Sequence, residues 1–288
     1  MSKFISFLLS LSLIAFSLLP RSANAAEVSR KIILIAGKKS HGPGEHEYVK
    51  SVKLLKILLD QSPNLHGITT EIYFNGWPDD PTVLDSAATI VLISDGMEWL
   101  PWTFAEDRVR IMEKQIDRGC GFLTLHFSTY VPIQFARQAL NWNGGFFDYD
   151  GDPAIRSAQK TIETVIALPT QDHPIVRGVA PYHYKEEFYY KMHFVPNAAQ
   201  IIPIVSVPAL SDKPQEQIVG WAFRSKNGGR SVGLTFGHYY ENWKLDDYRK
   251  LILNAIVWTS GADVPVGGVQ STFVGETEVN KIPDNARN

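Results

Sequence analysis

The first half of the chain alternates short apolar runs with segments of helical periodicity, and this pattern restricts the fold more than any other feature. The apolar runs are 31–37, 67–74, 89–94 and 119–126, and the helical segments between them are 45–59 and 104–118. Buried runs of this length are typical of parallel strands that helices cover on both faces. Because such connections are right-handed, the pattern predicts an α/β fold, a doubly wound and mainly parallel sheet of flavodoxin type.

The second half of the chain changes character. Four further strands are predicted at 161–168, 201–207, 218–223 and 231–236, with few helices between them. They predict an antiparallel extension together with the last strand of the main sheet. A helix at 246–258 closes the domain, which we place at residues 26–265. The tail 266–288 is expected to wrap loosely around it or to be partly disordered.

The N-terminus predicts export. A basic start precedes an apolar stretch over 4–19, and Ala23-Asn24-Ala25 provides a peptidase site, so residues 1–25 are expected to be a signal peptide. A membrane anchor is the alternative, but the stretch is short for a span of about 20 residues. We therefore expect cleavage after Ala25 and a periplasmic or secreted protein with no membrane segment.

Charge and cysteine content restrict the partners and the chemistry. The net charge is −2, which provides no basic surface for phosphates, so nucleic acid is not an expected partner. Cys120 is the only cysteine, so an intramolecular disulfide cannot form and packing must stabilise the domain. Because Cys120 lies early in a predicted strand, we assign it to the core and not to catalysis.

Polar residues follow several of the predicted strands at the point where each strand ends. These rims are 41–47, 95–99, 126–130 and 238–243. In open α/β sheets, ligands bind beyond the carboxyl ends of the strands. The four rims are therefore expected to converge on one ligand site.

Histidines and carboxylates in these rims suggest a metal site. His41 and His46 lie beside Glu45 and Glu47, and His126 ends an apolar strand. Imidazole and carboxylate groups bind divalent metals such as zinc. For His41 and His46, the alternative is a polar loop whose carboxylates cap a helix. For His126, the alternative is a buried histidine of the core. The metal candidates are His41, His46, His126 and His238.

An ordered series of short motifs resembles the ThuA-like (trehalose-utilisation) family. The motifs are Ser40-His41-Gly-Pro-Gly-Glu45-His46-Glu47, Ser94-Asp95-Gly96, Leu125-His126-Phe-Ser128, Trp142-Asn-Gly-Gly145, His173-Pro174-Ile, Gly228-Gly229-Arg230-Ser231, Gly237-His238 and Arg249-Lys-Leu-Ile-Leu-Asn254-Ala-Ile-Val-Trp258. They extend over most of the chain, from about Lys31 to Pro265. The resemblance implies the fold of class I glutamine amidotransferases, which is a flavodoxin-like sheet.

The same resemblance implies positions for catalytic groups. In amidotransferases the nucleophilic cysteine follows a strand where His126 stands here, and the catalytic histidine follows the last sheet strand, where His238 stands. A glutamate comes close behind that histidine, which suggests Glu241. Because no cysteine occupies the nucleophile position, glutamine amidotransferase chemistry is excluded. A histidine and carboxylate site for acid–base or metal-assisted chemistry remains.

A small carbohydrate is the partner that the family name implies. The first hypothesis is an enzyme on a sugar, a glycoside or a 3-keto sugar, acting as hydrolase, lyase or isomerase with His126, His238 and Glu241. Of the acids Glu186 and Glu187, one is expected to accept hydrogen bonds from a sugar and the other to be solvated. The expected substrate-binding residues are His41, Gly42, Asp95, Ser128, Trp142, Glu187 and Trp243.

Two alternatives accompany this hypothesis. Tryptophans near the rims are also typical of a carbohydrate-binding protein without catalytic activity; they are Trp77, Trp99, Trp102, Trp142 and Trp243. A metal-dependent form of either function is the third possibility.

Overall fold

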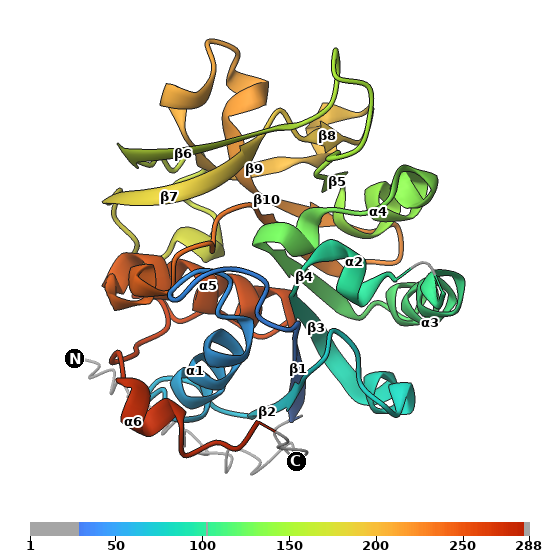
Figure 1. The fold of residues 1–288 in the computed structure, drawn as a ribbon. Helices are drawn as coiled ribbons and strands as arrows, with labels where there is room; N and C mark the ends of the chain where they lie inside the picture. The colour runs from blue at the N-terminus through green and yellow to red at the C-terminus, as the bar shows by residue number, and fades with distance from the viewer. Residues whose placement is uncertain (1–28, 102, 285–288) are drawn as a thin grey trace, which may run out of the picture.

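The computed structural model describes residues 29–101 and 103–284. Its main feature is a seven-stranded sheet in the order β2-β1-β3-β4-β11-β10-β9 (Figure 1). The strands are β1 (Arg30–Ala36), β2 (Ile68–Tyr73), β3 (Ala87–Ile93), β4 (Gly121–Leu125), β9 (Ile202–Ser206), β10 (Ile218–Arg224) and β11 (Arg230–Leu234). The first five strands in this order pair in parallel, and β10 and β9 continue the sheet antiparallel. The predicted flavodoxin-like sheet with an antiparallel extension is confirmed.

Helices cover both faces of this sheet. They are α1 (Tyr48–Asp60), α2 (Gly96–Trp99), α3 (Ala105–Asp117), α4 (Ala136–Asn143), α5 (Asp246–Thr259) and α6 (Glu276–Val279). Ile32 and Leu34 of β1 belong to the core formed with α1 and α5, whereas Ile33 and Ile35 belong to the core formed with α3 and α4. Successive side chains of a strand point to opposite faces, so an uninterrupted apolar run serves both cores.

Two small antiparallel pairs lie over the carboxyl edge of the main sheet (Figure 1). One joins β6 (Ala158–Val165) to β7 (His183–Tyr190), and the other joins β5 (Gly145–Phe146) to β8 (His193–Phe194). The sequence predicted β6 slightly later in the chain and did not predict β7, whose run of charged and aromatic residues hides the alternation. The β6–β7 pair forms one wall of the site described below.

The C-terminal tail is packed, so the expectation of a loosely wrapped tail is wrong for its described part. Val269 and Val279 are fully buried in the α1–α5 core. Lys50 and Lys53 of α1 also form ion pairs with acids of the tail. The predicted signal peptide, residues 1–25, lies outside the described residues. None of the helices in the described ranges is long and apolar enough to cross a membrane.

The histidine of the His-Pro-Ile motif has a capping position in this fold. His173 precedes a short 3-10 helix (Pro174–Val176) and accepts a hydrogen bond from the backbone N–H of Ile175. Burial, followed by the charges of Arg224, Arg230 and Arg177, lowers the pKa of His173 to about 4. The folded protein therefore holds this side chain neutral.

Acid should destabilise the protein in part through His173. Its pKa is depressed on folding, so its contribution to stability is intact above the unfolded value near 6.5 and is lost as pH falls toward 4. We expect His173→Asn, which keeps the cap, to avoid this loss. Between pH 7.5 and pH 4.5 the variant should therefore lose about 1–2 kcal/mol less unfolding free energy than the wild type, a figure reduced to allow for the partial exposure of the ring. Urea unfolding at both pH values measures this, with the exposed His183→Asn as control; equal pH slopes in both variants and the wild type would contradict it.

Candidate metal centre

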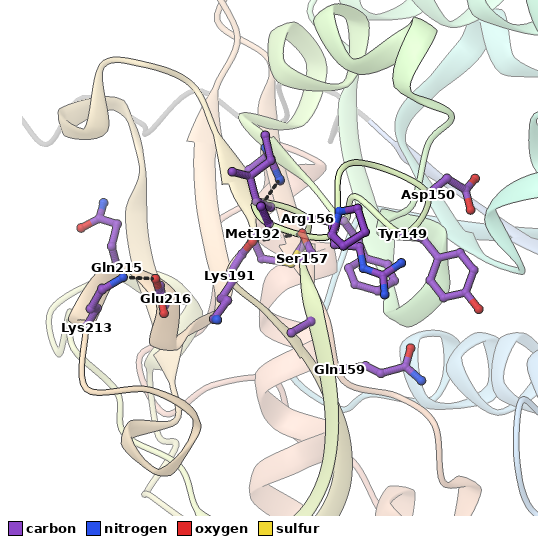
Figure 2. A pocket seen from close by; sticks show the side chains of 16 residues that line it. Tyr149, Asp150, Arg156, Ser157, Gln159, Lys191, Met192, Lys213, Gln215 and Glu216 are labelled. Atoms are coloured by element: carbon purple, nitrogen blue, oxygen red, sulfur yellow. Dashed lines mark hydrogen bonds and ion pairs between the residues drawn. The ribbon is translucent and has the colours of Figure 1, made fainter.

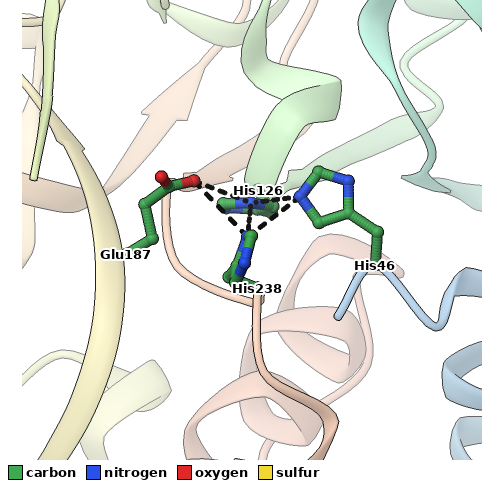
Figure 3. A group of neighbouring side chains, drawn as sticks. All are labelled: His46, His126, Glu187 and His238. Atoms are coloured by element: carbon green, nitrogen blue, oxygen red, sulfur yellow. Dashed lines mark hydrogen bonds and ion pairs between the residues drawn. The ribbon is translucent and has the colours of Figure 1, made fainter. Parts of the chain in front are cut away.

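Four side chains from distant parts of the sequence meet beyond the carboxyl edge of the sheet. His46 lies in the loop between β1 and α1, His126 directly follows β4, and His238 follows β11. Glu187 approaches from β7 (Figure 3). One ligand atom from each of the four lies within 4.8 Å of all the others, and the three histidines are buried. The convergence of rims predicted from the sequence therefore holds for the three histidines.

The spacing of these atoms matches a tetrahedral metal site. His46 Nε2 lies 3.0 Å from both His126 Nε2 and His238 Nδ1, and the latter two atoms are 3.3 Å apart. Glu187 Oε2 lies 3.6 Å from His126 Nε2 and 3.4 Å from His238 Nδ1. Ligands about 2.0–2.1 Å from a tetrahedral zinc ion are separated by about 3.3–3.4 Å. Three nitrogens and one carboxylate oxygen are also a donor set that suits zinc and related divalent metals.

In each imidazole, the nitrogen that points away from the group (the outer nitrogen) lies near an oxygen that can accept its proton. His126 Nδ1 donates to the backbone oxygen of Thr235 at 3.0 Å, and His238 Nε2 lies 3.7 Å from a carboxylate oxygen of Glu45. His46 Nδ1 lies 3.3 Å from Asp95. In the neutral form of each ring, contacts of this kind favour the proton on the outer nitrogen, as in carboxylate–histidine–metal arrangements. The three inner nitrogens then direct lone pairs at one another, which is unfavourable unless a cation lies between them.

The hydrogen bonds around His46 hold its ring in this orientation. Tyr48 Oη donates to Asp95 Oδ1 at 2.6 Å, and Ser40 Oγ donates to the same oxygen at 3.2 Å. Burial opposes ionisation of Asp95, but the hydrogen bonds from His46, Tyr48 and Ser40 outweigh it and lower the pKa of Asp95. Asp95 is therefore a carboxylate that supports a ligand from behind.

Burial also favours the uncharged histidines that a metal requires. Desolvation, with the charge of His46 as the next cause, lowers the pKa of His126 well below its usual value. The same two causes lower the pKa of His238 to about 4. At neutral pH both rings are thus neutral and present free lone pairs.

Comparison with known proteins shows to which family the chain belongs. A family model described as ThuA, trehalose utilisation, matches residues 34–259. The chain belongs to the ThuA family. Among curated proteins, none matches this ThuA-family chain.

Two solved ThuA-like proteins share the fold of this family member. The protein from Parabacteroides merdae is 13% identical with a TM-score of 0.59, and the match covers 84% of this chain and 97% of that one. The protein from Bacteroides uniformis is 16% identical with a TM-score of 0.58, covering 84% and 96%. At these identities the likeness establishes the fold alone.

Two of the four proposed ligands stand on strained backbone. His126 has φ of 55° and His46 has φ of 45°, in the left-handed region that side chains with a Cβ rarely adopt. Each costs about 1–3 kcal/mol and persists only where the surroundings fix it. The turn at His126 directs its side chain out of the end of β4 into the centre, so the strain serves the position of the ligand.

A buried acid behind the group holds the loop that carries His238. The carboxylate of Glu186 accepts hydrogen bonds from the backbone N–H groups of Gly237 and His238 and from Asn242 Nδ2. Burial raises the pKa of Glu186 to about 8, against the opposing effect of these hydrogen bonds. The expectation that one acid of this pair is merely solvated is wrong. Glu186 positions His238, while Glu187 faces the ligands.

Tyr189 is a site residue that the sequence analysis missed. Its hydroxyl lies 3.0 Å from His126 Nε2, and its ring stacks between His126 and Phe147 at centroid distances of 4.6 and 4.1 Å. It also shares a hydrogen bond with Glu187. Tyr189 follows Glu187 at a spacing of two in β7, so recognition of that strand would have placed both on one face.

Three other candidates lie at the mouth or edge of the group. His41 is exposed and its ring is tilted against that of His46, with ring centroids 3.7 Å apart, so it lies beside the four clustered residues and not among them. Gly42 is exposed in the same loop. Glu241 is exposed on a 3-10 helix after His238 and is not one of the four clustered residues.

The structure places the remaining candidates in supporting positions. Ser128 Oγ donates to the backbone oxygen of Ser94 and accepts from its N–H, which ties β3 to the turn after β4. Trp142 of α4 is buried against Phe122, and Trp243 is buried with its indole N–H donating to Ser51. These three side chains stabilise the frame of the site.

The tryptophans do not form a sugar-binding rim. Trp77, Trp99, Trp142 and Trp243 are each no more than 8% exposed, and Trp102 lies outside the described residues. Large aromatic side chains are buried because each removes much apolar surface from water. The interpretation of these four residues as ligand platforms is therefore wrong.

The geometry of the four clustered residues predicts that each chain binds one metal ion. Protein purified without chelator or affinity tag should contain about one divalent transition-metal ion per chain, and His126→Ala should abolish this content. Asp95→Asn should weaken the affinity about 10–100-fold, because Asp95 holds His46 and is not itself one of the four ligands. Elemental analysis and metal titration measure these effects. The exposed His183→Ala is the control, and a wild type that binds no more metal than His126→Ala contradicts the prediction.

Proposed function

We propose that this protein is a metal-dependent enzyme of carbohydrate metabolism. The observation that carries the proposal is the convergence of three imidazole nitrogens and the Glu187 carboxylate within 4.8 Å of one another, with most of the separations close to those of a tetrahedral site. Membership of a family described as trehalose utilisation suggests a carbohydrate role. The proposed substrates are a sugar, a glycoside or a 3-keto sugar, and the reaction class is hydrolysis, elimination or isomerisation.

The ligands and their neighbours would divide the chemistry between them. His46, His126, His238 and Glu187 would hold a divalent ion, which, when bound, would supply Lewis-acid chemistry to the reaction. The hydroxyl of Tyr189, beside His126 and Glu187, is placed to hydrogen-bond an oxygen of the substrate. It is buried, and burial, followed by the charge of Glu187, raises its pKa, so it remains a donor.

His41 is suited to move protons at the mouth of the centre. It is exposed and its Nδ1 lies 2.9 Å from Ser40 Oγ, so its other ring nitrogen has no protein partner among the described residues. Partial desolvation by its neighbours, followed by the charge of His46, lowers the pKa of His41 below its usual value near 6.5. At neutral pH the ring is therefore a base, which abstraction of a proton beside a sugar carbonyl requires.

Loss of the ligands should abolish turnover. On a panel of glycosides and their 3-keto derivatives, His126→Ala and His46→Ala should lower kcat/KM about 10²–10⁴-fold, because the ion and its positioned groups are lost. Tyr189→Phe should retain the metal and lower kcat. Mass spectrometry of products and elemental analysis measure the two effects separately, with His183→Ala as control. Unchanged turnover in both histidine variants contradicts the proposal.

We also propose that the protein is exported, on the strength of residues 1–25 alone. The mature chain should begin at Ala26, because Ala23-Asn24-Ala25 is a peptidase site. N-terminal sequencing of the protein recovered from a cell fractionation measures this, with Ala25→Arg expected to block cleavage. Intact Met1 on protein in the cytoplasmic fraction contradicts it.

A further inference from the structure

A large open cavity lies beside the metal centre, on the far side of the Tyr189 ring. It has a volume of about 1060 Å³. It is bounded by the loop after β5, the start of β6, the turn between β7 and β8, and the segment 213–216 (Figure 2). Its lining includes Phe147, Tyr149, Arg156 and Gln159. The volume is at the upper end of the roughly 300–1,000 Å³ of ordinary ligand pockets.

Two contacts connect this cavity to the ligands. Phe147 lines the cavity and stacks on Tyr189, whose opposite face stacks on His126. Gln159 pairs directly with Tyr189 across the β6–β7 ladder. Residues opposite one another in an antiparallel pair project from the same face, so Gln159 projects from the face that carries Tyr189 and Glu187. The cavity and the metal centre are therefore neighbours along one face of the ribbon.

The loop that forms the cavity wall is fixed by Asp148. Its backbone N–H donates to Ser157 Oγ at 3.0 Å, and its carboxylate accepts from Gly151 N at 2.9 Å. A Cβ at Gly151 would lie 2.0 Å from Asp148 Oδ2, so the loop closes this tightly only with glycine there. Tyr130 also donates to Asp150. A wall held at both ends is formed before any ligand arrives, which favours binding.

The chemistry of the lining suits a neutral polyhydroxyl compound. Tyr149 is 49% exposed, although it lies among aromatic neighbours. Within the part of the chain that the structure describes, the side chains of Arg156 and Gln159 have no hydrogen-bond or ion-pair partner, and Gln159 extends toward the side on which Tyr149 lies (Figure 2). Cations and acids both line the cavity, so no strong charge of one sign selects an ion. Sugars bind by placing a C–H face on an aromatic ring and their hydroxyls on amide and guanidinium groups.

We propose that this cavity is a sugar-binding subsite in which Tyr149 and Gln159 hold one unit of the substrate while another reaches the metal centre. The substrate is then a disaccharide or a longer glycoside, not a free monosaccharide. This inference rests on the proposed function for the reacting end of the substrate, but the binding step depends on the cavity alone.

Calorimetry on the full mature chain tests the subsite, with glucose, trehalose, sucrose and maltotriose as probes. At least one of the three larger probes should bind the wild type more tightly than glucose. Tyr149→Ala and Gln159→Ala should each weaken that binding about 10-fold or more, whereas Tyr149→Phe, which keeps the ring, should restore it. Gln270→Ala, an exposed glutamine outside the cavity, is the matched control.

The same titrations in the His126→Ala background separate the two proposals. Persistent binding there, still sensitive to Tyr149→Ala, supports the subsite whether or not the metal chemistry is right. The subsite is overturned if none of the larger probes binds, or if Tyr149→Ala and Gln159→Ala bind them as the wild type does. In an active wild type, the two variants should raise KM for disaccharides with little change in kcat, which distinguishes them from ligand variants.

Discussion

The lone pairs of three imidazole nitrogens, held about 3 Å apart, are the constraint on which the site depends. Each ring has its proton committed to an outer acceptor, so the inner atoms repel one another unless they share a positive charge. A single proton can bridge only two of them, whereas one metal ion satisfies all three together with Glu187. The strained turns at His46 and His126 show that the fold keeps these atoms together at a cost in backbone energy.

The sheet explains why this group forms where it does. Parallel strands bring their carboxyl ends to a common edge, so the residues after β1, β4 and β11 are neighbours although they are far apart in sequence. This part of the architecture was predictable, because buried parallel strands have a clear signature of uninterrupted apolar residues. The positions of the three clustered histidines were predictable for the same reason, since each directly follows such a strand or lies in the loop after it.

Glu187 and its neighbours were harder to predict. β7 has the sequence His-Tyr-Lys-Glu-Glu-Phe-Tyr-Tyr, in which buried Glu186 and Tyr184 alternate with partly exposed polar residues. Polar residues on the inner face hide the period of two on which strand prediction depends. Glu186 is buried because four donors satisfy its carboxylate, and this network is formed only in three dimensions. For the tryptophans the prediction failed in the opposite direction. Their polar neighbours in the sequence suggested that they are exposed, but tertiary packing buries Trp77, Trp99, Trp142 and Trp243.

The β6–β7 pair is what turns a sheet edge of common type into a specific site. One face of β7 holds the His238 loop through Glu186, and the other presents Glu187 and Tyr189 to His126. Because Gln159 of β6 is paired directly with Tyr189, the proposed sugar subsite and the metal centre have a fixed separation set by a hydrogen-bonded ladder. A ladder of eight paired residues resists sliding, since a shift by one residue would turn Glu187 and Tyr189 away from the ligands. On the proposals made above, this geometry would favour a substrate that spans both positions at one defined length, and the distance between sugar units would then decide which glycosides bind.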